Sequence, residues 1–209
     1  MKTDENTQMN VNSALYSFFA TIFAKEPTCK LLEAFKQDEN RELFSSCGID
    51  PLSDIRDLSL ERQKEVLEVE YARLFLVPPV AARLRESLRA PGEGKLWGES
   101  TVRVNRIYEK FGFKLDKDFK DTPDHLSAEL SFLAELSKLE SEYASGGLKE
   151  ARKGVMNVKK YFLNNHILAW FPGLKDDVDK HATFCYYKDI SRLLGMVLNE
   201  EKIALTGGE

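Results

Sequence analysis

An acidic residue and a histidine stand side by side in Pro123-Asp124-His125, at the start of a long apolar helical pattern. A carboxylate beside an imidazole offers an acceptor and a donor, which suits the binding of backbone or guanidinium groups of a peptide. The same residues have a structural interpretation, because Asp124 complements the positive end of a helix dipole and His125 can lie on the surface beside it. The spacing alone favours the structural interpretation.

The other polar motifs lack the spacing of known catalytic, metal or phosphate sites. No histidine follows a glutamate by three residues, which argues against a di-metal carboxylate site, and neither HExxH nor a serine nucleophile elbow occurs. The run Gly92-Glu93-Gly94-Lys95 lacks the first glycine and the Ser or Thr of a phosphate-binding loop. We therefore expect no catalytic residue, no metal site and no cofactor.

Two further features have alternative interpretations. Trp97, beside an irregular segment, either anchors a partner, since tryptophan is enriched at binding hot spots, or packs in the core. Arg83, Arg85 and Arg89 form either a solvated face or a cradle for a phosphate-bearing cofactor.

Apolar residues recur with helical spacing along almost the whole chain, and no segment has the sustained alternation of a strand. The sequence therefore predicts an all-α fold, a single-domain helical bundle over residues 1–209, with residues 1–10 as a flexible N-terminus. The longest irregular segment is 77–99, and 166–173 is expected to be an aromatic connector. The expected helices cover 11–24, a segment after Thr28, 41–46, 59–75, 100–111, 123–145, 148–165 and 178–198.

Charge and composition limit the class of partner and the compartment. A net charge of −4 argues against nucleic acid, whose phosphates select clustered Lys and Arg. No run approaches the ~20 apolar residues that a membrane span needs, so we expect no stable membrane insertion. The three cysteines are far apart and odd in number, which fits a reducing compartment. We expect a cytoplasmic protein.

Three blocks of residues resemble signatures of the TorD/DmsD/NarJ chaperones, the redox enzyme maturation proteins. They occur in consistent order between about residues 13 and 198. The blocks are Tyr71-Ala72-Arg73-Leu74-Phe75; Pro123-Asp124-His125-Leu126 with Glu129-Leu130 and Phe132-Leu133; and His166-Ile167-Leu168-Ala169-Trp170 followed by Phe184, Tyr186, Tyr187 and Leu193-Leu194.

The resemblance implies a TorD-like fold and a cytoplasmic chaperone for a molybdopterin-dependent oxidoreductase. Such a chaperone binds the apo form of the enzyme or its twin-arginine leader, assists cofactor insertion and delays export. In the family the Asp-His pair is implicated in leader binding, so the binding interpretation of Asp124 and His125 becomes the preferred one. The full set of expected peptide-binding residues is Pro123, Asp124, His125, Tyr71, Phe75, Leu96, Trp97 and Glu99.

One departure from the family and two alternative functions remain. Residues 80–85 replace the Pro-rich, aromatic stretch that family members often carry, which leaves groove shape and client identity open. A maturation factor that binds guanine nucleotide or molybdopterin guanine dinucleotide would use the residues from Arg83 to Lys95. A structural helical subunit would use Asp124 and His125 only as a helix start. The connector 114–121 also allows a homodimer, including a domain-swapped form.

Overall fold

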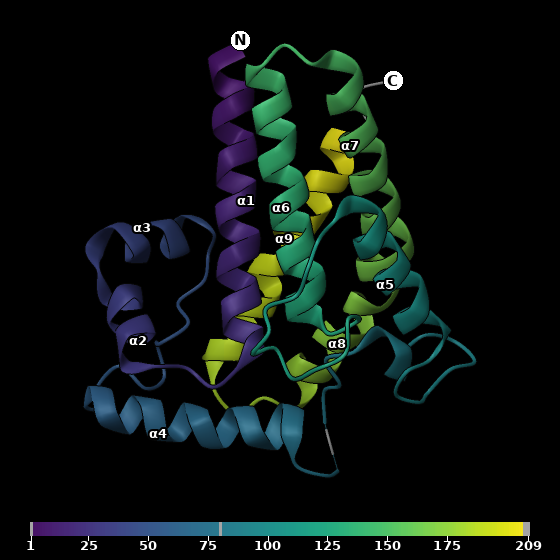
Figure 1. The fold of residues 1–209 in the computed structure, drawn as a ribbon. Coiled ribbons are helices and arrows are strands. Elements are labelled where there is room, and N and C mark those ends of the chain that lie inside the picture. The colour runs from purple at the N-terminus through teal and green to yellow at the C-terminus, as the bar shows by residue number, and fades with distance from the viewer. Residues whose placement is uncertain (1, 80, 207–209) are drawn as a thin grey trace. The chain divides into compact units, whose positions relative to one another are not determined.

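The chain is divided between two compact units. The structure, a computed structural model shown in Figure 1, describes residues 2–79 and 81–206, with side chains from residue 11 onward. The first unit comprises Met1–Ala24, Leu84–Trp170 and Val197–Glu209, and the second comprises Lys25–Arg83 and Phe171–Met196. Each unit is described by itself. That residues 1–209 behave as a single domain stays a prediction.

Helix α6 (Leu126–Ser145) is the central helix of the first unit. It packs along α1 (Lys2–Ala24) and against α7 (Lys149–Phe162). Apolar residues on several of its sides are almost wholly buried, as its expected central position requires. They are Leu126, Leu130, Phe132, Leu133 and Leu136. The same unit contains the 3-10 helix η2 (Glu86–Leu88), α5 (Glu99–Phe111) and the π-helix η3 (Leu163–Ile167).

Aromatic rings fill the space between α5, α6 and α7. The ring centroid of Phe132 lies 4.8 Å from that of Tyr108 and 4.9 Å from that of Phe162. Large buried rings of this kind contribute several kcal/mol each, since truncating a core Phe to Ala typically costs about 3–5 kcal/mol. These rings pack the first half of α6 against α5 and α7.

The second unit contains α2 (Cys29–Lys36), α3 (Asp38–Ser46), α4 (Leu60–Tyr71) and the π-helix η1 (Ala72–Leu76). Thr28 and Ser59 cap α2 and α4 as expected, because their hydroxyl oxygens accept hydrogen bonds from backbone N–H groups in the first turn. Two long helices, α8 (Leu168–His181) and α9 (Cys185–Thr206), have residues in both units.

Several helix boundaries differ from the predicted ones. Helix α1 begins at Lys2, so the backbone of residues 2–10 is helical where a flexible N-terminus was expected. Helix α6 begins at Leu126, and Pro123 precedes it instead of lying in its first turn. The predicted connector 166–173 is wrong, because η3 continues to Ile167 and α8 follows from Leu168 with Pro172 inside the helix. Proline there gives up one backbone hydrogen bond, a cost that tertiary packing offsets.

The all-α class is confirmed. Among the residues that the structure describes, extended pairing is limited to one antiparallel bridge between Arg85 and His125. No described helix combines the length and the apolar character that crossing a membrane requires.

Candidate functional site

The loop before η2 is paired with the residues that lead into α6. The backbone N–H of Leu126 donates to the carbonyl of Leu84 at 2.8 Å, and the N–H of Glu86 donates to the carbonyl of Asp124 at 3.0 Å. This short bridge fixes residues 84–88 against the head of α6. Segments far apart in sequence therefore meet at the motif that the sequence singled out.

The Asp124 carboxylate is at the centre of this junction and is 0% exposed. Its Oδ2 accepts a hydrogen bond from the N–H of Ser87 at 2.8 Å, and its Oδ1 accepts one from the hydroxyl of Thr101 at 2.9 Å. Thr101 belongs to α5, so one side chain joins η2, α5 and the head of α6. Asp124 positions the loop and touches no solvent, and its expected role in peptide binding stays a prediction.

His125 is the N-cap of α6. Its Nδ1 accepts a hydrogen bond from the N–H of Ser127 at 3.2 Å, so this nitrogen carries no proton. Burial lowers the pKa of His125 from 6.5 to about 4, against the opposing effect of Asp121. The imidazole is therefore neutral at pH 7 and, like Asp124, serves the local structure. Pro123 is also buried, and its carbonyl accepts a bond from the Tyr108 hydroxyl at 3.0 Å.

Arg85 is committed to Asp121. Its Nε and Nη2 lie 2.7 Å and 2.5 Å from the two carboxylate oxygens, a bidentate geometry. Burial opposes ionisation of Asp121, but the hydrogen bonds from Arg85 prevail and lower its pKa. Because this guanidinium is already paired, the geometry does not favour a phosphate cradle at Arg85.

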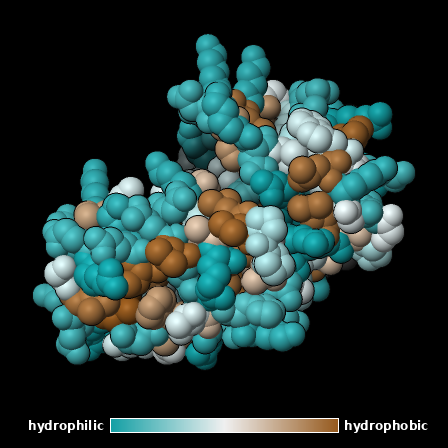
Figure 2. Space-filling view, turned by 90° about the horizontal axis from the view of Figure 1, so that it is seen from below, coloured by the Kyte–Doolittle hydropathy of each residue, from teal (hydrophilic) through white to brown (hydrophobic). Residues whose placement is uncertain are grey.

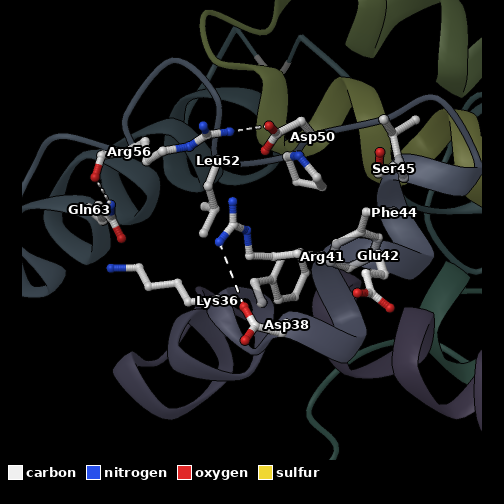
Figure 3. Close-up of a pocket in the computed structure, with 13 residues that line it drawn as sticks. Lys36, Asp38, Arg41, Glu42, Phe44, Ser45, Asp50, Leu52, Arg56 and Gln63 are labelled. Carbon is white, nitrogen blue, oxygen red and sulfur yellow. Dashed lines mark hydrogen bonds and ion pairs between the residues drawn. The ribbon is translucent and has the colours of Figure 1, made fainter.

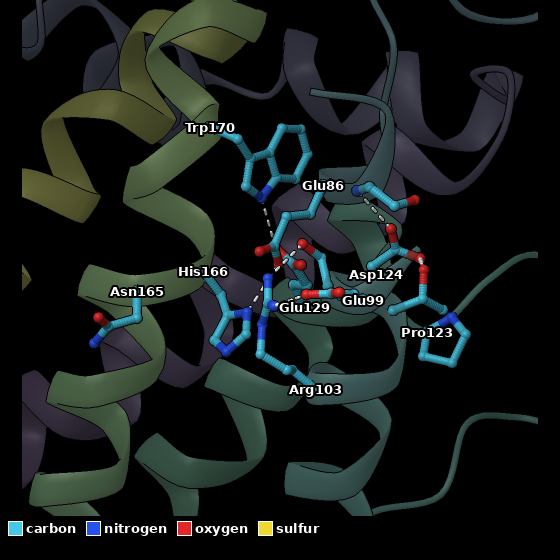
Figure 4. A network of polar contacts seen from close by, with 12 residues as sticks. Glu86, Glu99, Arg103, Pro123, Asp124, Glu129, Asn165, His166 and Trp170 are labelled. Carbon is cyan, nitrogen blue, oxygen red and sulfur yellow. Dashed lines mark hydrogen bonds and ion pairs between the residues drawn. The ribbon is translucent and has the colours of Figure 1, made fainter. Parts of the chain in front are cut away.

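A second buried network lies beside the first and was missed by the sequence analysis. His166 Nδ1 is 2.8 Å from a carboxylate oxygen of Glu86, and Trp170 Nε1 donates to Glu129 at 3.2 Å (Figure 4). Burial, followed by the neighbouring charge of Glu86, raises the pKa of Glu129 well above its ordinary value. The block 166–170 gave the only sequence signal for this network, through its histidine and tryptophan.

A cavity of about 370 Å³ opens in front of Glu86. We call it the acidic cavity, because the carboxylates of Glu86, Glu93 and Glu99 line it. Figure 4 shows Glu86, Glu99 and Asn165 among the residues around it. Arg103 Nη2 lies 3.2 Å from Glu93 and its Nη1 lies 3.4 Å from Glu99, so a guanidinium is already held there. The lining residues are Glu86, Ala90, Pro91, Gly92, Glu93, Lys95, Glu99, Arg103, Asn165 and Ala169.

The predicted groove residues fall into two groups. Leu96 and Trp97 are 53% and 67% exposed, and Glu99 lines the acidic cavity, so these three are available to a ligand. Tyr71 and Phe75 belong to the second unit and are buried, with ring centroids 5.1 Å apart. Their rings pack into an aromatic core with Tyr187, and their expected role in peptide binding stays a prediction.

The second unit contains a larger cavity, of about 710 Å³, between α2, α3 and the start of α4 (Figure 3). Apolar residues such as Phe35 and Phe44 line it, and charged residues surround it. Arg56 is paired with Asp50, and Arg41 lies 3.9 Å from Asp38. None of the predicted site residues lines this cavity.

The surface in Figure 2 is mostly hydrophilic, with hydrophobic side chains gathered in separate small patches. In the part of the chain that the structure describes, no group of three or more His, Cys, Asp or Glu residues could hold a metal ion. The candidate site comprises the loop that Asp124 positions and the acidic cavity beside it.

Comparison with known proteins decides the family. The family model described as nitrate reductase delta subunit matches residues 27–176. The chain belongs to this family. A chaperone protein TorD from Vibrio parahaemolyticus is 25% identical to this member of the nitrate reductase delta subunit family, over 86% of this chain and 87% of the relative. A chlorate reductase assembly chaperone protein from Ideonella dechloratans is 30% identical, over 68% of this chain and 72% of the relative.

The fold of this nitrate reductase delta subunit family member also matches a solved structure. A crystal structure of an Archaeoglobus fulgidus protein assigned to redox enzyme maturation covers 90% of this chain and 93% of its own, with a TM-score of 0.52 and 22% identity. That match shows the fold. Both of these relatives are named as chaperones, and the predicted resemblance to the chaperone family is confirmed.

Proposed function

We propose that this protein is a cytoplasmic chaperone that binds the apo form of a molybdopterin-dependent oxidoreductase through its twin-arginine leader, assisting cofactor insertion and delaying export. The relatives support the client class, since one is named for chlorate reductase assembly and others are TorD chaperones. The observation that carries the leader-binding part is the acidic cavity. Its carboxylates hold a guanidinium, the group that a twin-arginine leader presents.

The chemistry of the cavity supports a guanidinium ligand from outside. Glu99 and Glu93 accept the guanidinium of Arg103, whose side chain is about half exposed and can leave. A leader arginine would take the place of Arg103, with its planar fork matching the carboxylates. Leu96, which is exposed beside the cavity, would contact the apolar part of the leader.

Pro123, Asp124 and His125 enter this proposal as positioning residues. Asp124 holds the N–H of Ser87, the residue that follows Glu86 in the cavity wall. A change at Asp124 would therefore weaken leader binding by moving Glu86, although the carboxylate itself touches no ligand.

The test is a calorimetric titration of the full chain with a synthetic twin-arginine leader peptide and with its twin-lysine counterpart. Glu99→Gln should weaken leader binding about three- to tenfold, the loss of one partly exposed charge pair. Arg103→Gln should tighten it, because the internal competitor is gone. Glu109→Gln, on the exposed part of the same helix, is the matched control and should bind like the wild type.

Arg103→Gln is the decisive variant, because misfolding would weaken leader binding and could not tighten it. Equal affinity for the arginine and lysine peptides, or an unchanged affinity in both Glu99→Gln and Arg103→Gln, would refute the cavity as the leader site. No measurable leader binding by the wild type would refute the proposed function itself.

A further inference from the structure

Beside the acidic cavity lies a surface of the opposite charge. A hollow of about 440 Å³ is lined by Lys95, Trp97, Gly98, Glu99, Val102, Arg103 and Arg106. We call it the basic aromatic surface. Three cations and one carboxylate line it in a chain whose net charge is −4, so its local charge opposes that of the whole protein. Lys95 and Arg106 have no carboxylate partner among the described residues, whereas Arg103 is paired.

Trp97 is exposed on this surface, and its backbone has an unfavourable conformation. Its φ is 59°, in the left-handed region that residues with a side chain rarely adopt, and its side chain is 67% exposed. Holding a non-glycine residue there costs about 1–2 kcal/mol, and the exposed ring recovers little of that through burial. Glycine would satisfy the backbone without this cost. Strain of this kind is concentrated at binding sites, where the side chain serves a partner.

The neighbouring residues continue the apolar character of the ring. Val102, one turn into α5, is 45% exposed and lines the same hollow, and Leu96 precedes Trp97 in the loop. An aromatic anchor beside an aliphatic side chain and flanked by cations is complementary to a polypeptide that presents acidic residues around an apolar one. It is less suited to the basic head of a leader, because it is lined by three cations and one carboxylate, whereas the acidic cavity has three carboxylates and two cations.

A phosphate-bearing ligand fits the surface less well. The usual phosphate donors would be the free N–H groups at the start of α5. Here the Glu93 carboxylate already accepts from the N–H of Ser100 at 3.1 Å and from its hydroxyl at 2.6 Å. A negative charge therefore occupies the helix N-terminus, and a phosphate would meet it.

We propose that the basic aromatic surface binds an acidic, apolar segment of the client polypeptide outside the leader, with Trp97 as the anchor and Lys95 and Arg106 as the charge partners. This proposal rests on the proposed function for the identity of the client. Together the two surfaces would let one chaperone hold the client at a basic and at an acidic segment, which raises the effective concentration of each contact for the other.

The probe is a fluorescein-labelled peptide of alternating Glu and Leu with one central Phe, and the control peptide has every Glu replaced by Gln. Binding is followed by anisotropy and by acrylamide quenching of tryptophan emission. The second tryptophan, Trp170, is buried, so protection from quenching reports on Trp97. The acidic peptide should bind and protect Trp97, and the Gln peptide should bind at least tenfold more weakly.

Variants separate binding from folding. Trp97→Gly should lose at least tenfold in affinity for the acidic peptide while its urea midpoint stays equal or rises, because glycine relieves the strain. Lys95→Gln with Arg106→Gln should weaken binding and flatten its salt dependence. Ile203→Ala, which removes a side chain that is 69% exposed elsewhere in the unit, and Lys110→Gln, farther along α5, should leave binding unchanged.

Three results would overturn the proposal: no binding of the acidic peptide by the wild type, binding that leaves Trp97 unprotected, or protection of Trp97 by guanosine triphosphate but not by the peptide. The two surfaces share Lys95, Glu99 and Arg103, whereas Trp97 and Arg106 line only the basic aromatic surface, so Trp97→Gly should leave the leader titration unchanged. If the wild type bound the acidic peptide but not the leader, the proposed function would be refuted and the proposal for the basic aromatic surface would be supported. If the wild type bound the leader but not the acidic peptide, only the proposal for the basic aromatic surface would be refuted.

Discussion

The Asp124 carboxylate accepts a hydrogen bond from the backbone N–H of Ser87 at 2.8 Å, inside the protein and out of reach of solvent. This bond joins two segments that are far apart in sequence, and Thr101 supplies a second donor to the same carboxylate. A carboxylate with two protein donors suits its burial, because a buried charge is tolerated when hydrogen bonds satisfy it. The arrangement makes Asp124 a structural residue of the candidate site.

Replacing Asp124 with Asn should destabilise the protein by about 2 kcal/mol. The amide NH₂ of asparagine would face one of the two hydrogen-bond donors, Ser87 or Thr101, so one of the two hydrogen bonds to the carboxylate would be lost. The measurement is urea unfolding followed by circular dichroism. Asp118→Asn, on the exposed connector before α6, is the control and should change the free energy of unfolding by less than about 0.5 kcal/mol. An equally small effect for Asp124→Asn would contradict the structural role.

The low pKa of His125 predicts a stability that depends on pH. Burial lowers this pKa to about 4 in the folded chain, against 6.5 when unfolded. A histidine with a depressed pKa adds stability above pH 6.5, and this stability is lost as the pH falls toward 4 because the unfolded chain takes up the proton first. The contribution is about 3 kcal/mol at full extent.

His125→Asn isolates that contribution. Asparagine is a good N-cap, so α6 keeps its start while the titrating group is removed. Between pH 6.5 and 4.5 the variant should lose less stability than the wild type, as measured by urea unfolding at several pH values. Parallel curves for the two proteins would mean that His125 is not buried as a neutral imidazole.

Replacement of Lys159, a buried residue away from the candidate site, should strongly lower the stability of the protein. It is 1% exposed, and its Nζ lies 3.0 Å from Glu140 and 2.5 Å from Glu201. Lys159→Met leaves two buried carboxylates without their shared cation and should cost about 3–5 kcal/mol. Lys153→Met, on the exposed face of the same helix, should be nearly neutral. Thermal unfolding of both variants tests the contrast, and a neutral Lys159→Met would contradict the buried charge cluster.

The start signals of several helices were readable from local sequence. Thr28 and Ser59 cap their helices as expected, and Gly112 ends α5 in the left-handed conformation with φ 65°. These features depend on residues within one helical turn, and local chemistry decides them. The predicted connector over residues 166–173 was wrong, because Pro172 lies inside α8 and tertiary packing offsets the local cost of a proline there.

The sequence predicted the residues of the candidate site only in part. Trp97 and Glu99 are exposed as a binding role requires, whereas Tyr71 and Phe75 are core residues of the other unit. A helical aromatic stripe has the same spacing in a groove and in a core, so periodicity could not separate the two. The oligomeric state, including a domain-swapped dimer, stays a prediction.

By itself the sequence determined the helical class, most of the helices and the family, because apolar periodicity and ordered motif blocks are carried by the chain alone. The tertiary structure decided what Asp124 and His125 do. Whether a polar side chain is a solvated ligand or a buried anchor depends on which distant segments cover it. Here the bridge between residues 84–88 and the head of α6 accompanies the burial of both side chains, whereas Trp97 and the acidic cavity remain open to a partner.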